Sequence, residues 1–178
     1  MSGKSSLHSV PRFGLITKGD DLPTSSNVVR YVPYARMRRD ADDMHLGPLP
    51  SAFEAREGEA DLSVIWCEYF DNDAKAQLRC AIEVLRNSRK IGPKACFCPV
   101  KTSDLLAGIA KSGRKGRAVY LPVDGNLAHA GVYGVPPEDE LLLSRLADEV
   151  WCSFLTKADA DALPLSGCAK SAYVDPTV

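Results

Sequence analysis

The chain has 178 residues, of which 45% are hydrophobic and 25% charged, and its formal net charge is −1. This length and composition suit one globular domain with a real core, and a sequence pI near 6.3 excludes a protein that coats DNA through overall positive charge. The sequence has no apolar run near the roughly 18 residues of a membrane span and no apolar signal-peptide core after Met1, so we expect a cytoplasmic protein without a membrane partner.

The N-terminal third contains strand signals after a polar start. Residues 1–11 hold few apolar anchors, so we expect them to be disordered. The segment 28–32 is β-branched and aromatic, which predicts a strand that ends at Pro33. The segment 62–70 (LSVIWCEYF) is almost continuously apolar, which predicts a buried central strand.

The middle of the chain alternates helix and strand signals. A helix is predicted from Asp71 or Asn72 to about Ser88, because apolar residues recur at helical spacing and Gly92 and Pro93 follow. A strand at 95–100, a helix at 104–111 and a strand at 118–123 come next. Together with the strand at 62–70 they make a βαβαβ pattern, which favours parallel strands.

The last third is predicted to be mainly helical. A loop over 124–136 precedes a long helix from Pro137, a short helix over 157–163 and a loose tail over 164–178. We therefore predict an α/β fold over residues 12–163. It is a small single-domain sandwich with a mostly parallel central sheet, extra N-terminal edge strands and a long C-terminal helix.

The charges alternate in blocks along the chain. Residues 1–39 hold seven Lys/Arg and two Asp/Glu, residues 40–75 hold two and ten, residues 76–117 hold ten and two, and residues 118–178 hold three and nine. A nearly neutral chain with this pattern can carry strong local fields, and such fields select partners. We expect the blocks to fold onto separate charged faces.

The second basic block predicts an anion-binding surface. If both predicted helices flank parallel strands in the same sense, their C-terminal ends meet at one edge and bring eight cations together. The alternative is a pair of solvated helix ends, because cations at helix C-termini also offset the helix dipole. The eight residues are Arg86, Arg89, Lys90, Lys94, Lys111, Arg114, Lys115 and Arg117.

Four single residues are candidates for chemistry: Arg30, His45, Glu68 and His129. Arg30, inside a predicted strand, could hold a phosphate or carboxylate through two hydrogen bonds, or could be a solvent-facing edge residue. His129 follows a predicted strand, where ligands of parallel α/β sheets bind, and could do acid–base work. A histidine packed in a surface loop is the alternative there. Glu68 could act as a base.

The order Arg30, His45, Ser51, Glu68 is loosely similar to the residue set with which enzymes of the ADP-ribosyl-transfer fold bind nicotinamide dinucleotides. The similarity covers scattered single residues without an intact motif. It therefore assigns no family, and we name no cofactor.

The metal-ligating residue types do not form a recognisable site. The acidic stretch 40–45 could offer oxygen ligands to Mg²⁺, but it lacks the glycine and distal Glu of a calcium loop. Cys96 and Cys98 point to one face of a strand, but this pair lacks the second knuckle of a structural zinc site. We expect no metal, and we expect the six cysteines to be reduced thiols packed as small hydrophobes.

Three functions are compatible with these signals. We favour a non-catalytic interaction protein that docks a protein partner through its charged faces. The first alternative is a small enzyme acting on a nucleotide or phosphorylated ligand, and a pocket that gathers Arg30, Glu68 and a histidine would favour it. The second alternative is a nucleic-acid-binding accessory protein that uses the block 86–117, and binding that weakens steeply with salt would favour that function.

Overall fold

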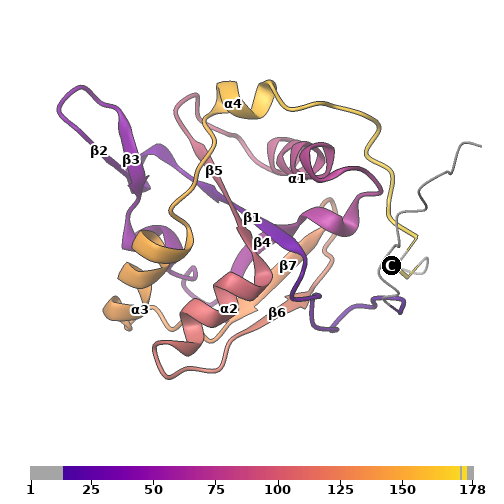
Figure 1. The fold of residues 1–178 in the computed structure, drawn as a ribbon, viewed down its shortest axis with the longest axis horizontal. Coiled ribbons are helices and arrows are strands. Elements are labelled where there is room, and N and C mark those ends of the chain that lie inside the picture. Colours follow the sequence, from indigo (N-terminus) through magenta and orange to yellow (C-terminus); the bar gives the residue numbers. More distant parts are fainter. Residues whose placement is uncertain (1–13, 173, 176–178) are drawn as a thin grey trace, which may run out of the picture.

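A five-stranded sheet forms the centre of the molecule (Figure 1) in the computed structural model, which describes residues 14–172 and 174–175. The expected disordered stretch 1–11 lies outside the described residues. The strands lie in the order β5–β1–β4–β7–β6. Their bounds are β1 (Asn27–Val32), β4 (Leu62–Trp66), β5 (Cys96–Lys101), β6 (Arg117–Tyr120) and β7 (His129–Tyr133).

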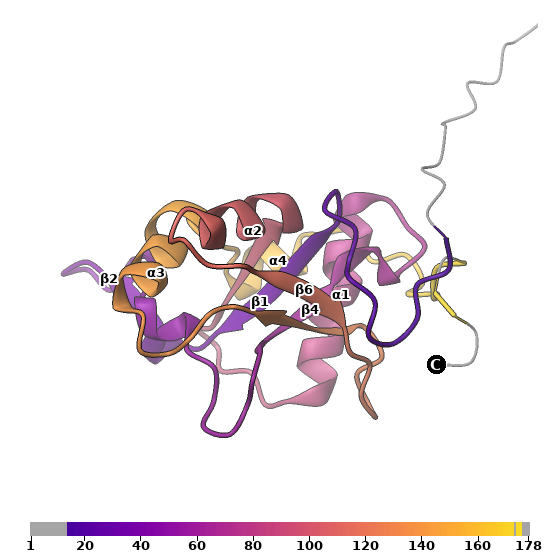
Figure 2. The same ribbon diagram turned by 90° about the horizontal axis from the view of Figure 1, so that it is seen from below.

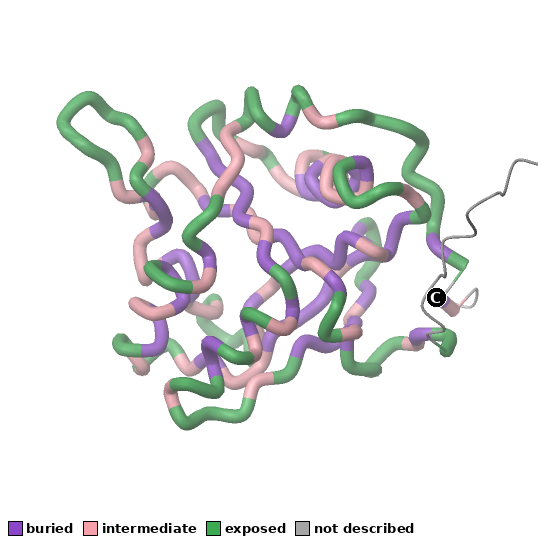
Figure 3. Tube along the Cα trace, viewed as in Figure 1, coloured by how far each residue is buried: buried purple, intermediate pink, exposed green. Residues whose placement is uncertain are grey.

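A separate hairpin projects from one end of the molecule (Figure 1). It consists of β2 (Met37–Arg39) and β3 (His45–Pro48), which pair antiparallel. The hairpin turn is exposed, whereas the strands of the central sheet are mostly buried (Figure 3). Short 3₁₀ turns follow the strands at η1 (Tyr34–Arg36), η2 (Pro50–Phe53) and η3 (Cys67–Tyr69).

The prediction of a mostly parallel sheet is wrong, because every strand pair in the sheet is antiparallel. The three strands of the predicted βαβαβ unit, β4, β5 and β6, do run in the same direction. However, β1 lies between β5 and β4, and β7 lies between β4 and β6. Thus β1 is not the edge strand that was expected, and the predicted loop 124–136 contains a strand that completes the sheet.

Helix α1 (Ala74–Ser88) begins at Asp73, whose carboxylate accepts the backbone N–H groups of Lys75 and Ala76. Its buried face includes Ile82 and Leu85. This amphipathic pattern is the reason that the helix could be predicted from sequence. Helix α2 (Thr102–Ala110) lies with α3 (Glu140–Arg145) on one side of the sheet, and the segment 54–61 loops out on the other side (Figure 2).

The predicted long C-terminal helix is also wrong. Helix α3 continues only through a π turn, η4 (Leu146–Val150), and ends at Trp151. The indole of Trp151 is fully buried and stacks on Phe53, with ring centroids 4.7 Å apart. Beyond it the chain is extended, and Leu155 exchanges backbone hydrogen bonds of 2.8 and 2.9 Å with Phe97 at the edge of β5. This edge pairing overrides the helical periodicity of the sequence.

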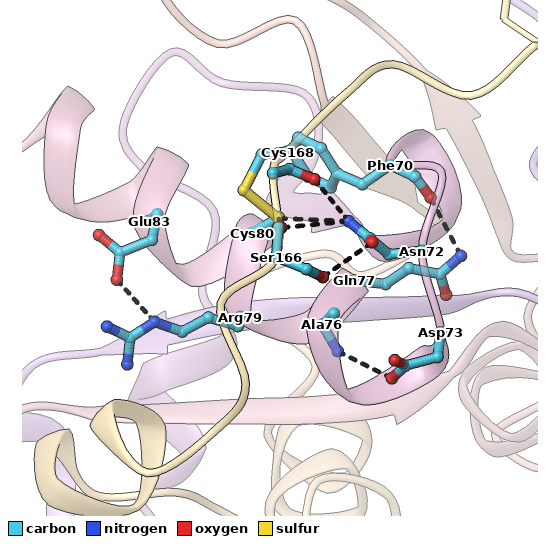
Figure 4. Close-up of a disulfide and its surroundings, with 11 residues drawn as sticks. Phe70, Asn72, Asp73, Ala76, Gln77, Arg79, Cys80, Glu83, Ser166 and Cys168 are labelled. Carbon is cyan, nitrogen blue, oxygen red and sulfur yellow. Dashed lines mark hydrogen bonds and ion pairs between the residues drawn. A yellow bond between two sulfur atoms is a disulfide. The ribbon is translucent and has the colours of Figure 1, made fainter.

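The C-terminal segment, for which a loose tail was expected, is joined to the body by a disulfide. After the short helix α4 (Lys157–Asp161), Cys168 bonds to Cys80 in α1, so the expectation of six reduced cysteines is wrong for this pair. The side chain of Asn72 lies between Ser166 and this disulfide (Figure 4), and its amide donates to the carbonyl of Gly167 at 2.8 Å. Among the described residues, no helix is long and apolar enough to cross a bilayer.

Candidate functional site

A cavity of about 220 Å³ opens where β1 and β4 diverge. The two strands pair at only two positions, Val28 with Trp66 and Val29 with Ile65. Beyond these positions β1 continues along β5 alone, so its half from Arg30 onward has no neighbour on the β4 side. The gap is lined by Val29, Tyr31 and Ile65 from the sheet, by Leu85 of α1, and by the segment 54–59.

Four arginines line this cavity, and we call the site the arginine hollow. Arg30 comes from β1, Arg36 from η1, Arg56 from the segment before β4, and Arg89 from the end of α1. Two glutamates, Glu54 and Glu59, also line the cavity, so its formal charge is positive.

Main-chain oxygens fix the guanidinium of Arg30 in the hollow. Its Nε donates to the carbonyl of Ala52 at 2.7 Å, and its Nη1 donates to the carbonyl of Ser63 at 2.7 Å. Arg30 thereby bridges the gap between the diverging strands. Neither bond neutralises its charge, because both acceptors are uncharged.

The other arginines of the hollow are held by three different kinds of contact. Arg36 Nη1 donates to the carbonyl of Ser51. The guanidinium of Arg89 lies 5.4 Å from the ring centre of Tyr31, and its buried Nε has no hydrogen-bond partner among the described residues. Only Arg56 has a carboxylate within ion-pair distance, Glu59 at 3.7 Å. Within the described part of the chain, Arg30, Arg36 and Arg89 form no ion pair.

The guanidinium of Arg30 is poorly hydrated and lies near three other positive charges. Burial lowers the pKa of Arg30 to about 9, and the charges of Arg36, Arg89 and Arg56 contribute to this shift. Burial, followed by the charge of Arg56, also lowers the pKa of Arg89. A charge that is unpaired and partly desolvated is costly, and an anion bound beside it would remove that cost.

One member of a serine–histidine pair lines the same cavity. Ser63, which lines the hollow from β4, has its Oγ 2.8 Å from Nε2 of His129 in β7. The other ring nitrogen, Nδ1, lies 2.7 Å from the carbonyl oxygen of Leu121. Because a carbonyl can only accept, Nδ1 carries the proton, and in the neutral ring Nε2 accepts from the Ser63 hydroxyl.

An acidic side chain packs against this pair. Gly131 is the cross-strand neighbour of Ser63, and a Cβ atom at Gly131 would lie only 2.4 Å from Oδ2 of Asp61. The missing side chain at Gly131 therefore makes room for the Asp61 carboxylate. Burial raises the pKa of Asp61, and the nearby charge of His129 opposes this shift.

The structure brings two of the four predicted residues together and places the other two elsewhere. Arg30 and His129 both contact Ser63, one through its carbonyl and one through its hydroxyl. Glu68 instead accepts the backbone and side-chain N–H groups of Asn27 at 2.8 Å and so fixes the start of β1. Burial raises the pKa of Glu68 in spite of these bonds.

His45 contacts a thiol away from the hollow. Its Nδ1 lies 3.1 Å from the Sγ of Cys96, and its ring contacts Phe154. Burial raises the pKa of Cys96 to about 11, so at neutral pH this residue is a thiol and not an activated thiolate.

The predicted basic surface is largely neutralised by carboxylates. Lys94 pairs with Asp43 at 2.5 Å, and Arg86 pairs with Asp161 at 2.7 Å. Arg89 lies in the hollow, and Lys90 and Lys115 form no ion pair among the described residues. The remaining pairs are Lys111 with Glu149, Arg114 with Asp139 and Arg117 with Asp21.

No family model matches the chain, and no curated protein or solved structure is significantly similar to it. Within the described residues, no three His, Cys, Asp or Glu side chains gather in a way that could hold a metal ion. The arginine hollow is therefore the candidate site on its own geometry.

Sequence reasoning missed half of the hollow and its serine. Arg36 and Arg56 were not among the predicted site residues, and Ser63 is a single small residue in an apolar strand. A signal for Ser63 did exist, because it is the one polar residue in the run LSVIW of β4. Its partner His129 is 66 positions away, so only the strand order reveals the pair.

Proposed function

We propose that this protein binds a small phosphorylated molecule in the arginine hollow. The observation that supports the proposal is that Arg30, Arg36 and Arg89 converge on one cavity without an ion-pair partner among the described residues. Guanidinium groups match the geometry of phosphate oxygens and bind them through paired hydrogen bonds. A protein that kept three such charges only for stability would pair them with carboxylates, as it does with Arg114 and Arg117.

The size of the cavity limits the ligand. Its volume of about 220 Å³ is below the range of about 300–1,000 Å³ that is common for drug-sized ligands. A phosphate or pyrophosphate group with a small attached moiety suits such a space. The apolar walls formed by Val29, Ile65 and Leu85 would contact the uncharged part of that molecule.

Calorimetric titration with inorganic pyrophosphate tests this proposal. We expect the wild-type chain to bind it and Arg89→Gln to bind it about tenfold more weakly, which corresponds to about 1.4 kcal/mol. Lys115→Gln is the matched control, because it removes one positive charge outside the hollow without breaking an ion pair of the described residues. Equal losses in both variants, or no binding to the wild type, would contradict the proposal.

Docking of a protein partner, or of nucleic acid, on a separate charged face is a second proposal with less support. Five of the eight cations predicted for that face pair with carboxylates of this chain. Only the local fields around Lys90 and Lys115 are left for a partner in this part of the molecule.

The cytoplasmic location expected from the sequence stays a proposal, and the disulfide is an observation against it. Disulfides are rare in reducing compartments, and Cys80 and Cys168 are bonded. Because Cys80 is buried, alkylation of thiols after the cells are quenched with acid and the protein is unfolded tests the location. If both cysteines are modified, a reducing compartment is supported, and if both are protected, an oxidising one is.

A further inference from the structure

Ser63 and His129 have the arrangement of a nucleophile and its base. The Nδ1–H of His129 is held by the carbonyl of Leu121 at 2.7 Å, and its Nε2 accepts from the Ser63 hydroxyl at 2.8 Å. In acyl and phosphoryl transfer, a serine is activated by a histidine that accepts from its hydroxyl and that a third group holds in orientation. The carbonyl of Leu121 fills the place that a carboxylate usually takes.

The nucleophile lies next to the anion site. Arg30 donates to the main-chain carbonyl of Ser63 at 2.7 Å, so its guanidinium contacts the residue that carries the hydroxyl. Ser63 also lines the cavity that the arginines surround. The inference below requires that a phosphate held by these arginines has its phosphorus within reach of the Ser63 Oγ.

Asp61 can stabilise the charge that catalysis creates. Its carboxylate packs on Gly131 beside His129, and the two groups interact electrostatically. When Nε2 takes a proton the ring becomes a cation, which a neighbouring carboxylate favours. Asp61 is a positioning residue in this arrangement, because it acts through the histidine.

We propose that Ser63 is the nucleophile of a phosphomonoester hydrolase and that His129 is its general base. The inference rests on the proposed function, because the arginine hollow must hold the phosphate. A bond forms between the Ser63 Oγ and phosphorus while the bond from phosphorus to the leaving oxygen breaks. The hydroxyl proton passes to Nε2 of His129 and from there to the leaving alcohol.

The second half of the reaction restores the enzyme. Water attacks the phosphoserine, its proton passes to His129, and the Ser63 oxygen leaves and regains that proton. The net change is one phosphomonoester and one water converted into one alcohol and one inorganic phosphate. The positive groups of the hollow would stabilise the charge on the transferring phosphoryl oxygens, which is the main requirement of phosphoryl transfer.

A neutral phosphorylating probe, diisopropyl fluorophosphate, tests the nucleophile without a natural substrate. Its phosphorus bonds to the serine oxygen, and fluoride leaves with the proton. Tryptic cleavage after Arg56 and Lys75 gives a peptide in which Ser63 is the only serine, so mass spectrometry locates the label. We expect labelling of Ser63 in the wild type, none in Ser63→Ala, and labelling at least tenfold slower in His129→Gln.

The same variants separate this inference from the proposed function. Arg89→Gln should still be labelled, because the probe is uncharged, and Ser63→Ala should still bind inorganic pyrophosphate, which also shows that the variant folds. A wild-type chain without label on Ser63 would overturn the nucleophile, whatever the variants do. Labelling without release of p-nitrophenolate from p-nitrophenyl phosphate would overturn the phosphomonoester as substrate.

Discussion

At the scale of single residues, Arg30 shows how a charged side chain can be kept in a sheet. It occupies the gap between two diverging strands and satisfies the carbonyls of Ala52 and Ser63. These bonds position the guanidinium but leave its positive charge unbalanced. Three further arginines around it give the cavity a positive field that favours an anion.

The pKa of Arg30 predicts a pH dependence for anion binding. A guanidinium with a pKa of about 9 is charged below that pH and neutral above it. Sulfate, whose own charge is constant over the range, should therefore bind up to about tenfold more weakly at pH 10 than at pH 8. Calorimetry at both pH values measures this ratio, and an unchanged affinity would contradict the loss of a binding charge on Arg30 over this range.

Arg30 could be predicted as a candidate because a strand arginine can hold an anion. His129 was a candidate because loops beyond strands often bind ligands, but it lies in β7 and not in the expected loop. Ser63 could not be predicted, since serine in a strand is common and its meaning depends on what faces it. The same holds for Arg56, which reaches the hollow only because the segment 54–61 lies near β1. Arg89 was predicted to bind an anion, but together with the seven other cations of the second basic block and not with Arg30. The residues next to these arginines in the sequence do not indicate which segments lie near β1 in space.

At the scale of elements, most helices and strands could be predicted but their order could not. The apolar spacing of α1 and the continuous apolar run of β4 are local signals. The insertion of β1 and β7 between the expected parallel neighbours depends on contacts between residues far apart in the sequence. The pattern of β7, HAGVY, contains alanine and glycine, and it is therefore a poor strand signal although it is buried.

A glycine at the end of β7 is predicted to fix the approach of two segments. Gly134 has a positive φ of 86°, and a Cβ atom there would lie 2.4 Å from the carbonyl oxygen of Lys115. Gly134→Ala should therefore cost about 2–4 kcal/mol of unfolding free energy. Gly125→Ala is the control, because Gly125 has a φ of 77° but nothing near its missing Cβ, and it should cost about 1 kcal/mol.

Urea denaturation of both variants measures this difference. If the two glycine substitutions destabilise the protein equally, backbone strain alone decides the cost. The close packing of β7 against the turn at Lys115 would then contribute nothing to the free energy of unfolding.

At the scale of the whole molecule, charge blocks that alternate along the chain neutralise one another in space. Arg38 pairs with Asp148 over 110 positions, and Lys94 pairs with Asp43 over 51. The antiparallel sheet places distant blocks side by side, so a pattern along the sequence does not become a pattern on the surface. The hollow is the exception, because it collects Arg30 and Arg36 from the first basic block, Arg89 from the second, and Arg56 from the acidic block between them.

The disulfide is predicted to stabilise the molecule by joining α1 to the C-terminal segment. It closes a loop of 88 positions, for which the loss of chain entropy in the unfolded state predicts about 4.6 kcal/mol. Urea denaturation should show this loss both for Cys168→Ser and for the wild type after reduction. Cys152→Ser, which removes an exposed free cysteine, should leave the stability unchanged. If reduction does not alter the wild type, the bond has no stabilising role.

The central claim, that the arginine hollow binds an anion, is tested most directly by NMR of the arginine side chains. In a ¹⁵N-labelled protein titrated with inorganic pyrophosphate, the account predicts that the Nε–H signals of Arg30, Arg36 and Arg89 shift together and saturate. The signals of Arg114 and Arg117, which pair with Asp139 and Asp21, should stay in place. Shifts confined to Arg114 and Arg117, or no shift at saturating pyrophosphate, would contradict the account.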